Sequence, residues 1–172
     1  DEVLFPDIFA LYQDAAADGS PVFSFNVSYQ GHGPYNTEKT YWGSEYCTGN
    51  YEPKTLNALN NYFHLVQDTS HYVKEFMSYL DSLDEPVVLV LFGDHKPWMG
   101  NGNTGYTEIG AGFDLSQLSG FREYYSTPYL IWANSAAREA LGNSFTGEGG
   151  DFSPCFLMNK VFELCGWEGP GF

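Results

Sequence analysis

The spacing of apolar residues predicts four helices along the chain. In residues 55–83, apolar side chains recur every three or four positions, which is typical of one long amphipathic helix. Residues 3–17 predict a shorter helix that ends at an Asp-Gly turn, and residues 114–125 predict another. A final helix is expected over residues 154–165, because a proline opens this segment and a glycine follows it.

Three short runs of β-prone residues lie between these helices. Residues 21–29 and 127–134 are rich in aromatic and β-branched side chains, which predicts a strand in each. The run over residues 86–92 is uniformly apolar, as is typical of a strand buried on both faces. Residues 36–54 and 135–150 read as loops, the second with a helical turn. The alternation predicts an α/β fold, a largely parallel sheet flanked by helices, in a single domain over residues 1–172.

Composition and charge restrict the classes of function. Hydrophobic residues make up 43% of the chain and aromatic residues 18%, which excludes a disordered protein. With 22 acidic and 7 basic residues, the net charge of −15 argues against a nucleic-acid partner. The three cysteines match no zinc motif and do not settle the compartment. No apolar stretch is long enough to span a membrane. The start within a helix-like segment, without methionine, suggests a piece of a longer protein.

Three polar residues follow predicted strands at the same end. His32 comes just after the first strand, and Asp94 and His95 come just after the second. If these strands are parallel, their side chains emerge at one edge of the sheet, where open α/β folds bind ligands. A carboxylate and an imidazole are both ligands for divalent ions such as Mn²⁺ or Zn²⁺. Taken singly, an Asp-His pair after a strand is more often a loop that hydrogen-bonds to itself.

Four segments in the same order resemble a known family. They are QGHGPY (30–35), residues 60–80 of the long helix, VVLVLFGDHKP (87–97) and STPYLIWAN (126–134). Together they resemble the C-terminal part of the lipoteichoic acid synthase branch of the sulfatases, which are phosphoglycerol transferases of the alkaline phosphatase superfamily. The most specific piece is the apolar strand that leads into Gly-Asp-His. The resemblance implies a partial alkaline phosphatase/sulfatase-like domain.

The resemblance also implies roles for individual residues. Asp94 and His95 match the family's metal ligands, with manganese as the expected ion and magnesium or zinc as alternatives. His32 matches the residue that contacts the phosphoglycerol group of the substrate. The family's threonine nucleophile belongs to an earlier segment that nothing in this chain matches. The chain alone is therefore expected to be inactive and to need the missing N-terminal part of its own domain.

The resemblance further implies a substrate and a location. The substrate is expected to be a phospholipid headgroup or a similar phosphate ester, at the extracellular face of a bacterial membrane, with the anchoring spans outside this chain. Two alternatives stay open. The chain can be a non-catalytic binding module that kept the fold, or part of a sulfatase or phosphodiesterase that acts on another ester.

Two further features have a functional and a structural interpretation. His64, Asp68 and His71 share one face of the long helix and have a spacing that can hold a metal, although packing and hydrogen bonding are the more common roles of such residues. Lys96 can add a positive charge at the rim of the site, but a loop lysine is more often simply solvated.

Overall fold

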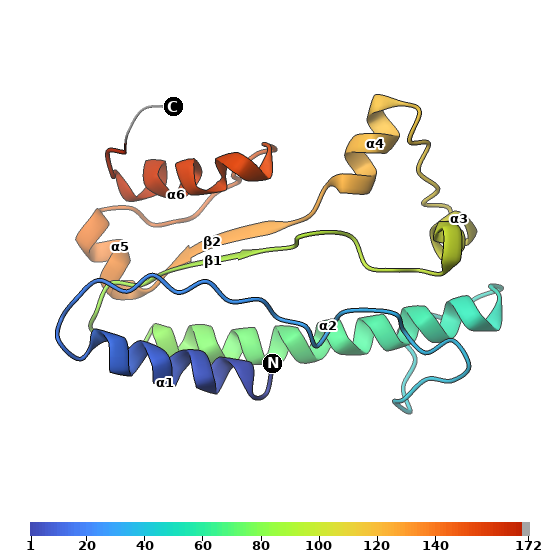
Figure 1. Ribbon diagram of the computed structural model, residues 1–172, viewed down its shortest axis with the longest axis horizontal. Helices are drawn as coiled ribbons and strands as arrows, with labels where there is room; N and C mark the ends of the chain where they lie inside the picture. Colours follow the sequence, from blue (N-terminus) through green and yellow to red (C-terminus); the bar gives the residue numbers. More distant parts are fainter. Residues whose placement is uncertain (170–172) are drawn as a thin grey trace. The chain divides into compact units, whose positions relative to one another are not determined.

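The computed structural model describes residues 1–169, which divide into two compact units. The first unit comprises Asp1–Phe76 and His95–Ser126, and the second comprises Met77–Asp94 and the chain from Thr127 onward. Six α-helices, two short 3-10 helices and two strands form the regular structure of the described residues (Figure 1).

The first unit is built on α1 (Leu4–Ala16) and most of α2 (Pro53–Leu80). Proline is favourable at the first position of α2 because its missing N–H leaves no helical hydrogen bond unmade. The apolar face of α2 buries Ala58 and Leu59. These two residues form the core of this unit with three others: Tyr35, Met99 and Tyr106.

Three short helices complete the first unit. They are the 3-10 helix η1 (Asn101–Asn103), α3 (Thr104–Glu108) and α4 (Leu118–Tyr125). The helix α3 lies in a Gly- and Asn-rich segment that the sequence pattern indicates as loop. Its N-cap, Asn103, has a φ of 61°, a left-handed conformation that asparagine tolerates better than most residues.

Buried polar side chains of α2 hold the loop over residues 36–47. The side-chain oxygen of Asn60 accepts from the backbone N–H groups of Tyr46 and Cys47, at 2.7 and 2.9 Å. The Asn61 amide donates to the carbonyls of Asn36 and Lys39, at 2.8 and 2.9 Å. Both asparagines are buried, and these bonds satisfy loop groups that would otherwise lose their water.

The second unit contains two strands, β1 (Val88–Phe92) and β2 (Tyr129–Ala133), which pair antiparallel with Val90 opposite Ile131. Two helices, α5 (Ser135–Leu141) and α6 (Leu157–Cys165), follow β2, and the 3-10 helix η2 (Pro154–Phe156) leads into α6. The core of this unit joins the sheet to α6 through four buried residues: Ile131, Leu157, Val161 and Cys165.

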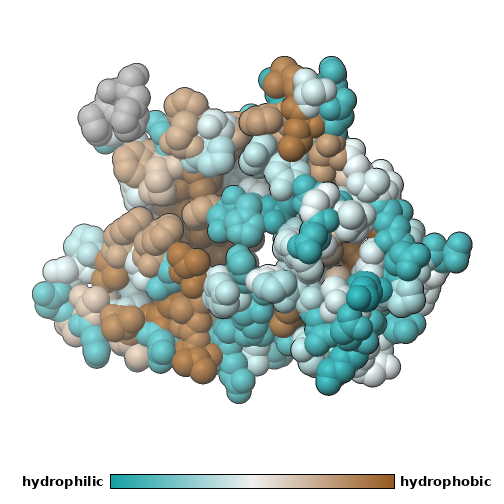
Figure 2. All heavy atoms as spheres, turned by 45° about the vertical axis from the view of Figure 1, so that its right-hand side comes forward, coloured by the Kyte–Doolittle hydropathy of each residue, from teal (hydrophilic) through white to brown (hydrophobic). Residues whose placement is uncertain are grey.

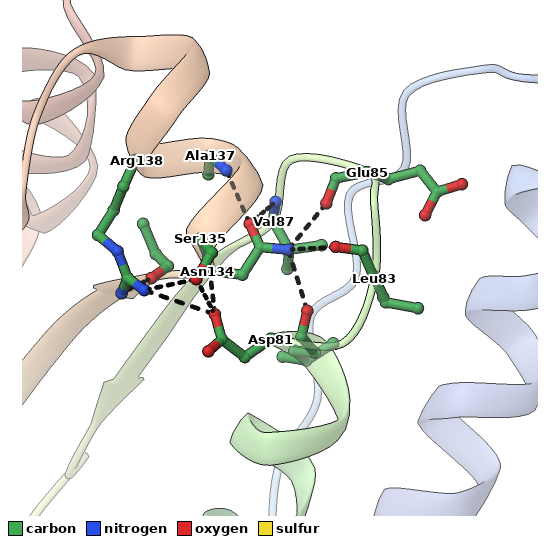
Figure 3. A network of polar contacts seen from close by, with 10 residues as sticks. Asp81, Leu83, Glu85, Val87, Asn134, Ser135, Ala137 and Arg138 are labelled. Carbon is green, nitrogen blue, oxygen red and sulfur yellow. Dashed lines mark hydrogen bonds and ion pairs between the residues drawn. The ribbon is translucent and has the colours of Figure 1, made fainter.

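Asn134 connects β2, α5 and the end of α2 within the second unit. Its side-chain oxygen accepts from the N–H groups of Val87 and Ala137, both at 2.9 Å, and so caps α5. Its amide nitrogen donates to the carbonyls of Leu80 and Glu85, at 3.0 and 2.8 Å (Figure 3). One fully buried side chain therefore fixes three chain segments.

The structure confirms the mixed helix and strand content but contradicts the largely parallel sheet. The two strands of the described residues form an antiparallel pair. Residues 21–29 are extended, as their β-prone pattern predicts, but they form no strand. A strand needs a hydrogen-bonded neighbour, and no backbone hydrogen bond joins residues 21–28 to the rest of the described chain. Alternating β-prone residues thus indicate an extended conformation without indicating its partner.

Large apolar side chains also reach the surface among polar ones (Figure 2). Four of them lie in the extended segment, where the exposed fractions are 66–80%: Phe23, Phe25, Val27 and Tyr29. None of the described helices has the length and hydropathy of a membrane span.

Candidate functional site

His32 lies in a tight turn that its neighbours hold in place. The backbone N–H of His32 donates to the carbonyl of Tyr29 at 3.0 Å, and the two rings stack with centroids 4.9 Å apart. Behind the turn, the buried Tyr35 donates its hydroxyl to the carbonyl of Gly31 at 2.8 Å. The His-Gly-Pro-Tyr segment is therefore anchored to the core by its tyrosine, while His32 stays exposed.

His95 lies beside His32 in the first unit. The two imidazoles meet edge to face, with ring centroids 5.5 Å apart and an interplanar angle of 89°. The Nδ1 atom of His32 is 2.6 Å from the carbonyl oxygen of Gly33, and that of His95 is 2.8 Å from the carbonyl oxygen of Lys96. The predicted convergence of these two histidines is thus observed.

The hydrogen bonds of the two rings decide which nitrogen bears the lone pair. A carbonyl oxygen only accepts, so we assign the proton of each neutral imidazole to Nδ1. The lone pair then belongs to Nε2 in both His32 and His95. A metal-binding histidine in proteins commonly has its other ring N–H held by such a carbonyl. A lone pair on Nε2 suits metal ligation, whereas donation to a phosphoryl oxygen requires a ring that carries a proton on both nitrogens.

Asp94 is an exposed residue that follows β1 in the second unit. The residue before it is firmly held, because the Gly93 N–H donates to the carbonyl of Pro128 at 3.1 Å and the Thr127 hydroxyl donates to the carbonyl of Gly93 at 2.6 Å. A Cβ atom at Gly93 would approach the Thr127 side chain to 3.2 Å, a tight contact that glycine avoids. The antiparallel pairing therefore fixes the point from which Asp94 projects.

The charge on Lys96 is engaged inside the first unit. Its ammonium donates to the carbonyl of Ser126 at 2.8 Å and lies 5.9 Å from the centre of the Phe113 ring. These contacts orient the loop after His95, which gives Lys96 a structural role that its position in the sequence does not reveal.

The described residues contain no group of three or more His, Cys, Asp or Glu side chains that could hold a metal. Asp94 and His95 have the right donor chemistry for a divalent transition ion, but two ligands are only part of a coordination sphere. On the long helix, the buried His64 is 2.8 Å from the carbonyl oxygen of Ser44, and His71 pairs with Glu75 at 3.4 Å. Those contacts support the structural interpretation of the helix face.

Two aromatic residues of the site are absent from the predictions made from the sequence. Tyr29 covers one face of the His32 ring, and Trp98 packs close to Gly33, where a Cβ atom would come within 3.2 Å of the Trp98 Cβ. The only signal in the sequence for the stacking contact is the position of Tyr29, three residues before His32. Aromatic residues are common in β-prone runs, so this signal is weak.

Comparison with known proteins identifies the family. A curated protein from Rhizobium meliloti (strain 1021), named "Putative cyclic beta-1,2-glucan modification protein", is 26% identical over 152 residues. The match covers 87% of this chain but only 23% of that protein, so the chain spans about a quarter of its relative. No solved structure gave a significant match. A profile of the sulfatase family matches residues 1–166, and the chain therefore belongs to the sulfatase family.

Proposed function

We propose that this chain carries part of the active site of a metal-dependent sulfatase-family enzyme that transfers or hydrolyses phosphoglycerol-type phosphate esters. The sulfatase family is one of enzymes, and the lipoteichoic acid synthase-like motifs supply the finer assignment. The observation that carries the proposal is the His32–His95 pair, whose rings meet at 5.5 Å with both Nδ1 atoms held by carbonyls.

The residues divide into two roles in this proposal. Asp94 and His95 hold a divalent ion, with manganese preferred over magnesium or zinc, and the remaining ligands come from outside this chain. Such an ion, when bound, acidifies the nucleophile's hydroxyl and neutralises negative charge on the phosphoryl oxygens. His32, in its imidazolium form, donates from Nε2 to the phosphoryl or glycerol oxygens of the substrate. Tyr29 stacks on the His32 ring and limits its rotation.

The nucleophile is proposed to lie in an N-terminal part of the same domain, which also completes the sheet. Phe23, Phe25 and Val27 expose 66–80% of their surface, and no backbone–backbone hydrogen bond joins this segment to the other described residues. An extended segment with free backbone groups and exposed aromatic side chains is suited to pair with a further strand. The limited coverage of the Rhizobium relative is consistent with such a part.

The substrate follows from the same resemblance. A phospholipid headgroup or a similar phosphate ester is the proposed donor, at the extracellular face of a bacterial membrane and with spans outside this chain. The name of the Rhizobium relative supports a glucan as the group that receives the phosphoglycerol. The phosphoryl oxygens move with the phosphoglycerol group from the donor to the receiving group, so the proposed contact of His32 with these oxygens serves both steps.

Metal content and turnover measured together on the full-length protein test these roles. Asp94→Ala and His95→Ala should each remove the metal and the turnover, since the ion activates the nucleophile. His32→Ala should keep the metal and lower turnover by about one to two decades, because a hydrogen bond to a charged oxygen is worth roughly 1.5–3 kcal/mol. His71→Ala, an exposed histidine on α2, is the matched control and should change neither quantity.

Two outcomes would contradict the division of roles. Loss of metal in His32→Ala, to the extent seen in Asp94→Ala, would make His32 a ligand. Full retention of metal and turnover in His95→Ala would remove the histidine pair from the site. A wild-type full-length protein without metal-dependent turnover would instead favour a non-catalytic binding module.

A further inference from the structure

A cavity of about 410 Å³ lies within the first unit, beside the loop that follows His95. This volume is in the range of roughly 300–1,000 Å³ that is typical of small-molecule sites. One wall comes from the start of α2 and the loop before it, and the other from the segment around η1 and α3. The lining residues are Thr37, Lys54, Thr55, Ala58, Trp98, Met99, Gly100, Asn101, Thr104 and Gly105.

The lining combines an aromatic ring with neutral hydrogen-bonding groups. Three threonine hydroxyls and the amide of Asn101 supply both donors and acceptors, and the indole of Trp98 supplies an apolar surface. The hydroxyl of Thr55 donates to the carboxylate of Glu108, so its oxygen keeps its lone pairs for another donor. This set suits a polyhydroxy compound, whose hydroxyl groups both donate and accept.

The single cation of the lining does not favour an anionic ligand. The Lys54 ammonium is 3.1 Å from a Glu38 carboxylate oxygen, and both side chains are more than two-thirds exposed, at 71% and 73%. The charge of Lys54 is therefore balanced and screened by water. With a net charge of −15, the whole chain also repels anions at long range.

The backbone is closely packed along the wall of the cavity that η1 and α3 form. A Cβ atom at Gly100 would come within 2.7 Å of the Thr104 hydroxyl, and one at Gly105 within 2.5 Å of the Met99 carbonyl oxygen. The Gly105 N–H donates to that same carbonyl at 2.8 Å. The hydroxyl of the buried Tyr106 donates to the Pro97 carbonyl at 2.6 Å. The wall is thus preorganised, which lowers the entropic cost of binding a ligand.

The cavity adjoins the histidine pair through Trp98. This residue lines the cavity and also packs against Gly33, the residue after His32. We propose that the cavity binds a neutral polyhydroxy group, such as a hexose ring of a glycan, with its apolar face on Trp98 and its hydroxyls on Asn101 and Thr104. The binding of this group is inferred from the cavity and does not depend on the proposed function. Its role as the group that receives the phosphoester rests on the proposed function.

Nuclear magnetic resonance titration of the 172-residue chain in chelator-treated buffer tests the binding without any metal. Methyl β-glucoside is the probe, and the Trp98 indole N–H signal, assigned with Trp98→Phe, is the readout. We expect a saturable shift of this signal. Thr104→Val and Asn101→Ala should each raise Kd about fivefold, the loss expected for one neutral hydrogen bond. Thr107→Val, an exposed threonine of α3 outside the lining, should leave Kd unchanged.

Inorganic phosphate serves as the competing probe. We expect no saturable shift with phosphate and no change of the glucoside Kd in Lys54→Met. Binding of phosphate without glucoside, no saturable shift with glucoside, or equal Kd values in Thr104→Val and Thr107→Val would each overturn the inference. The glucoside titration contains no metal, so its failure would leave the metal and turnover tests of His95 unaffected. In the same way, absence of the proposed enzymatic activity would leave the result of the glucoside titration unaffected.

Discussion

The imidazoles of His32 and His95 come from distant parts of the sequence and meet edge to face at 5.5 Å in the same unit. Each ring is held through Nδ1 by the carbonyl of the next residue, Gly33 or Lys96. A local contact therefore sets the orientation of each ring, while the packing of the loops sets their proximity. The two histidines can act on one bound group only if the rings are both close together and correctly oriented.

Replacement of Asn134 should strongly destabilise the chain. Asn134→Ala leaves buried carbonyls and N–H groups of three segments without their partners, which should lower the free energy of unfolding by about 2–4 kcal/mol. Asn134→Asp should be at least as harmful, because a carboxylate would face the carbonyls of Leu80 and Glu85. Urea unfolding measures both. Asn159→Ala, an exposed position on α6, should change stability by less than about 0.5 kcal/mol.

Asp81 should contribute stability that depends on pH. Hydrogen bonds from the Ser135 N–H and hydroxyl, with the nearby charge of Arg138, hold the pKa of Asp81 below its usual value (Figure 3). A lowered pKa means that the stabilising contribution is present above the unfolded pKa, about 3.9, and is lost as pH falls through the folded pKa. The stability difference between the wild type and Asp81→Asn should therefore be largest near neutral pH and narrow below about pH 4.

Urea unfolding from pH 7 to pH 3 measures this difference. Asp84→Asn, an exposed neighbour, is the control and should show little difference at any pH. If the stability difference between the wild type and Asp81→Asn stays constant from pH 7 to pH 3, the ionised carboxylate is not what stabilises this contact.

His64 should act through packing and not through a metal. Its Nε2 atom is 2.8 Å from the Ser44 carbonyl oxygen, and its ring stacks on Trp42 with centroids 4.7 Å apart. His64→Ala should lower the free energy of unfolding by about 2 kcal/mol through the lost hydrogen bond and the cavity left behind. His71→Ala, which removes an exposed side chain of the same helix, should cost less than about 0.5 kcal/mol.

Calorimetric titration with Mn²⁺ and Zn²⁺ complements the unfolding measurement for His64. Submicromolar binding to the 172-residue chain that disappears in both His64→Ala and His71→Ala would establish a metal site on the helix and refute the packing role. Unchanged, weak binding in all three proteins is the expected result.

A side chain at Gly105 should disturb the wall of the cavity. The new Cβ atom of Gly105→Ala would lie 2.5 Å from the Met99 carbonyl oxygen, a clash that only a backbone shift relieves. The expected loss of stability is about 1–3 kcal/mol. Gly112→Ala is the control, since its Cβ atom would find no atom closer than 3.9 Å. Thermal unfolding of the two variants checks the difference, and equal midpoints would mean that the backbone at Gly105 yields easily.

The exposed aromatic residues of the extended segment should matter only in the longer protein. Phe23→Lys with Phe25→Lys should change the stability of the 172-residue chain by less than about 0.5 kcal/mol, because both rings are already exposed, at 80% and 66%. The same pair of substitutions should unfold or inactivate the full-length protein, where we propose that these rings are covered. If the two substitutions change the stability of the full-length protein as little as that of the 172-residue chain, this would argue against a strand partner for this segment.

The sequence predicts most of the secondary structure, because the spacing of apolar residues is a local property. The long helix was expected at residues 55–83 and is observed at Pro53–Leu80, and the strands before Gly93 and Asn134 are observed close to their expected bounds. Helix ends differ by a few residues, as capping and fraying allow. The short helix α3 was missed because its glycine-rich sequence gives no helical period.

Strand pairing and the contacts of the site were decided by the tertiary structure. The pattern in residues 86–92 indicates a strand buried on both faces but holds no information about the direction of its neighbour, and β1 pairs antiparallel with β2. The motifs single out His32, Asp94 and His95 as chemically suited residues. Only the packing of the two loops brings His32 and His95 to 5.5 Å, because a contact between distant residues depends on the whole chain path. Residue type thus sets the chemistry that is available, and tertiary contacts set which groups act together.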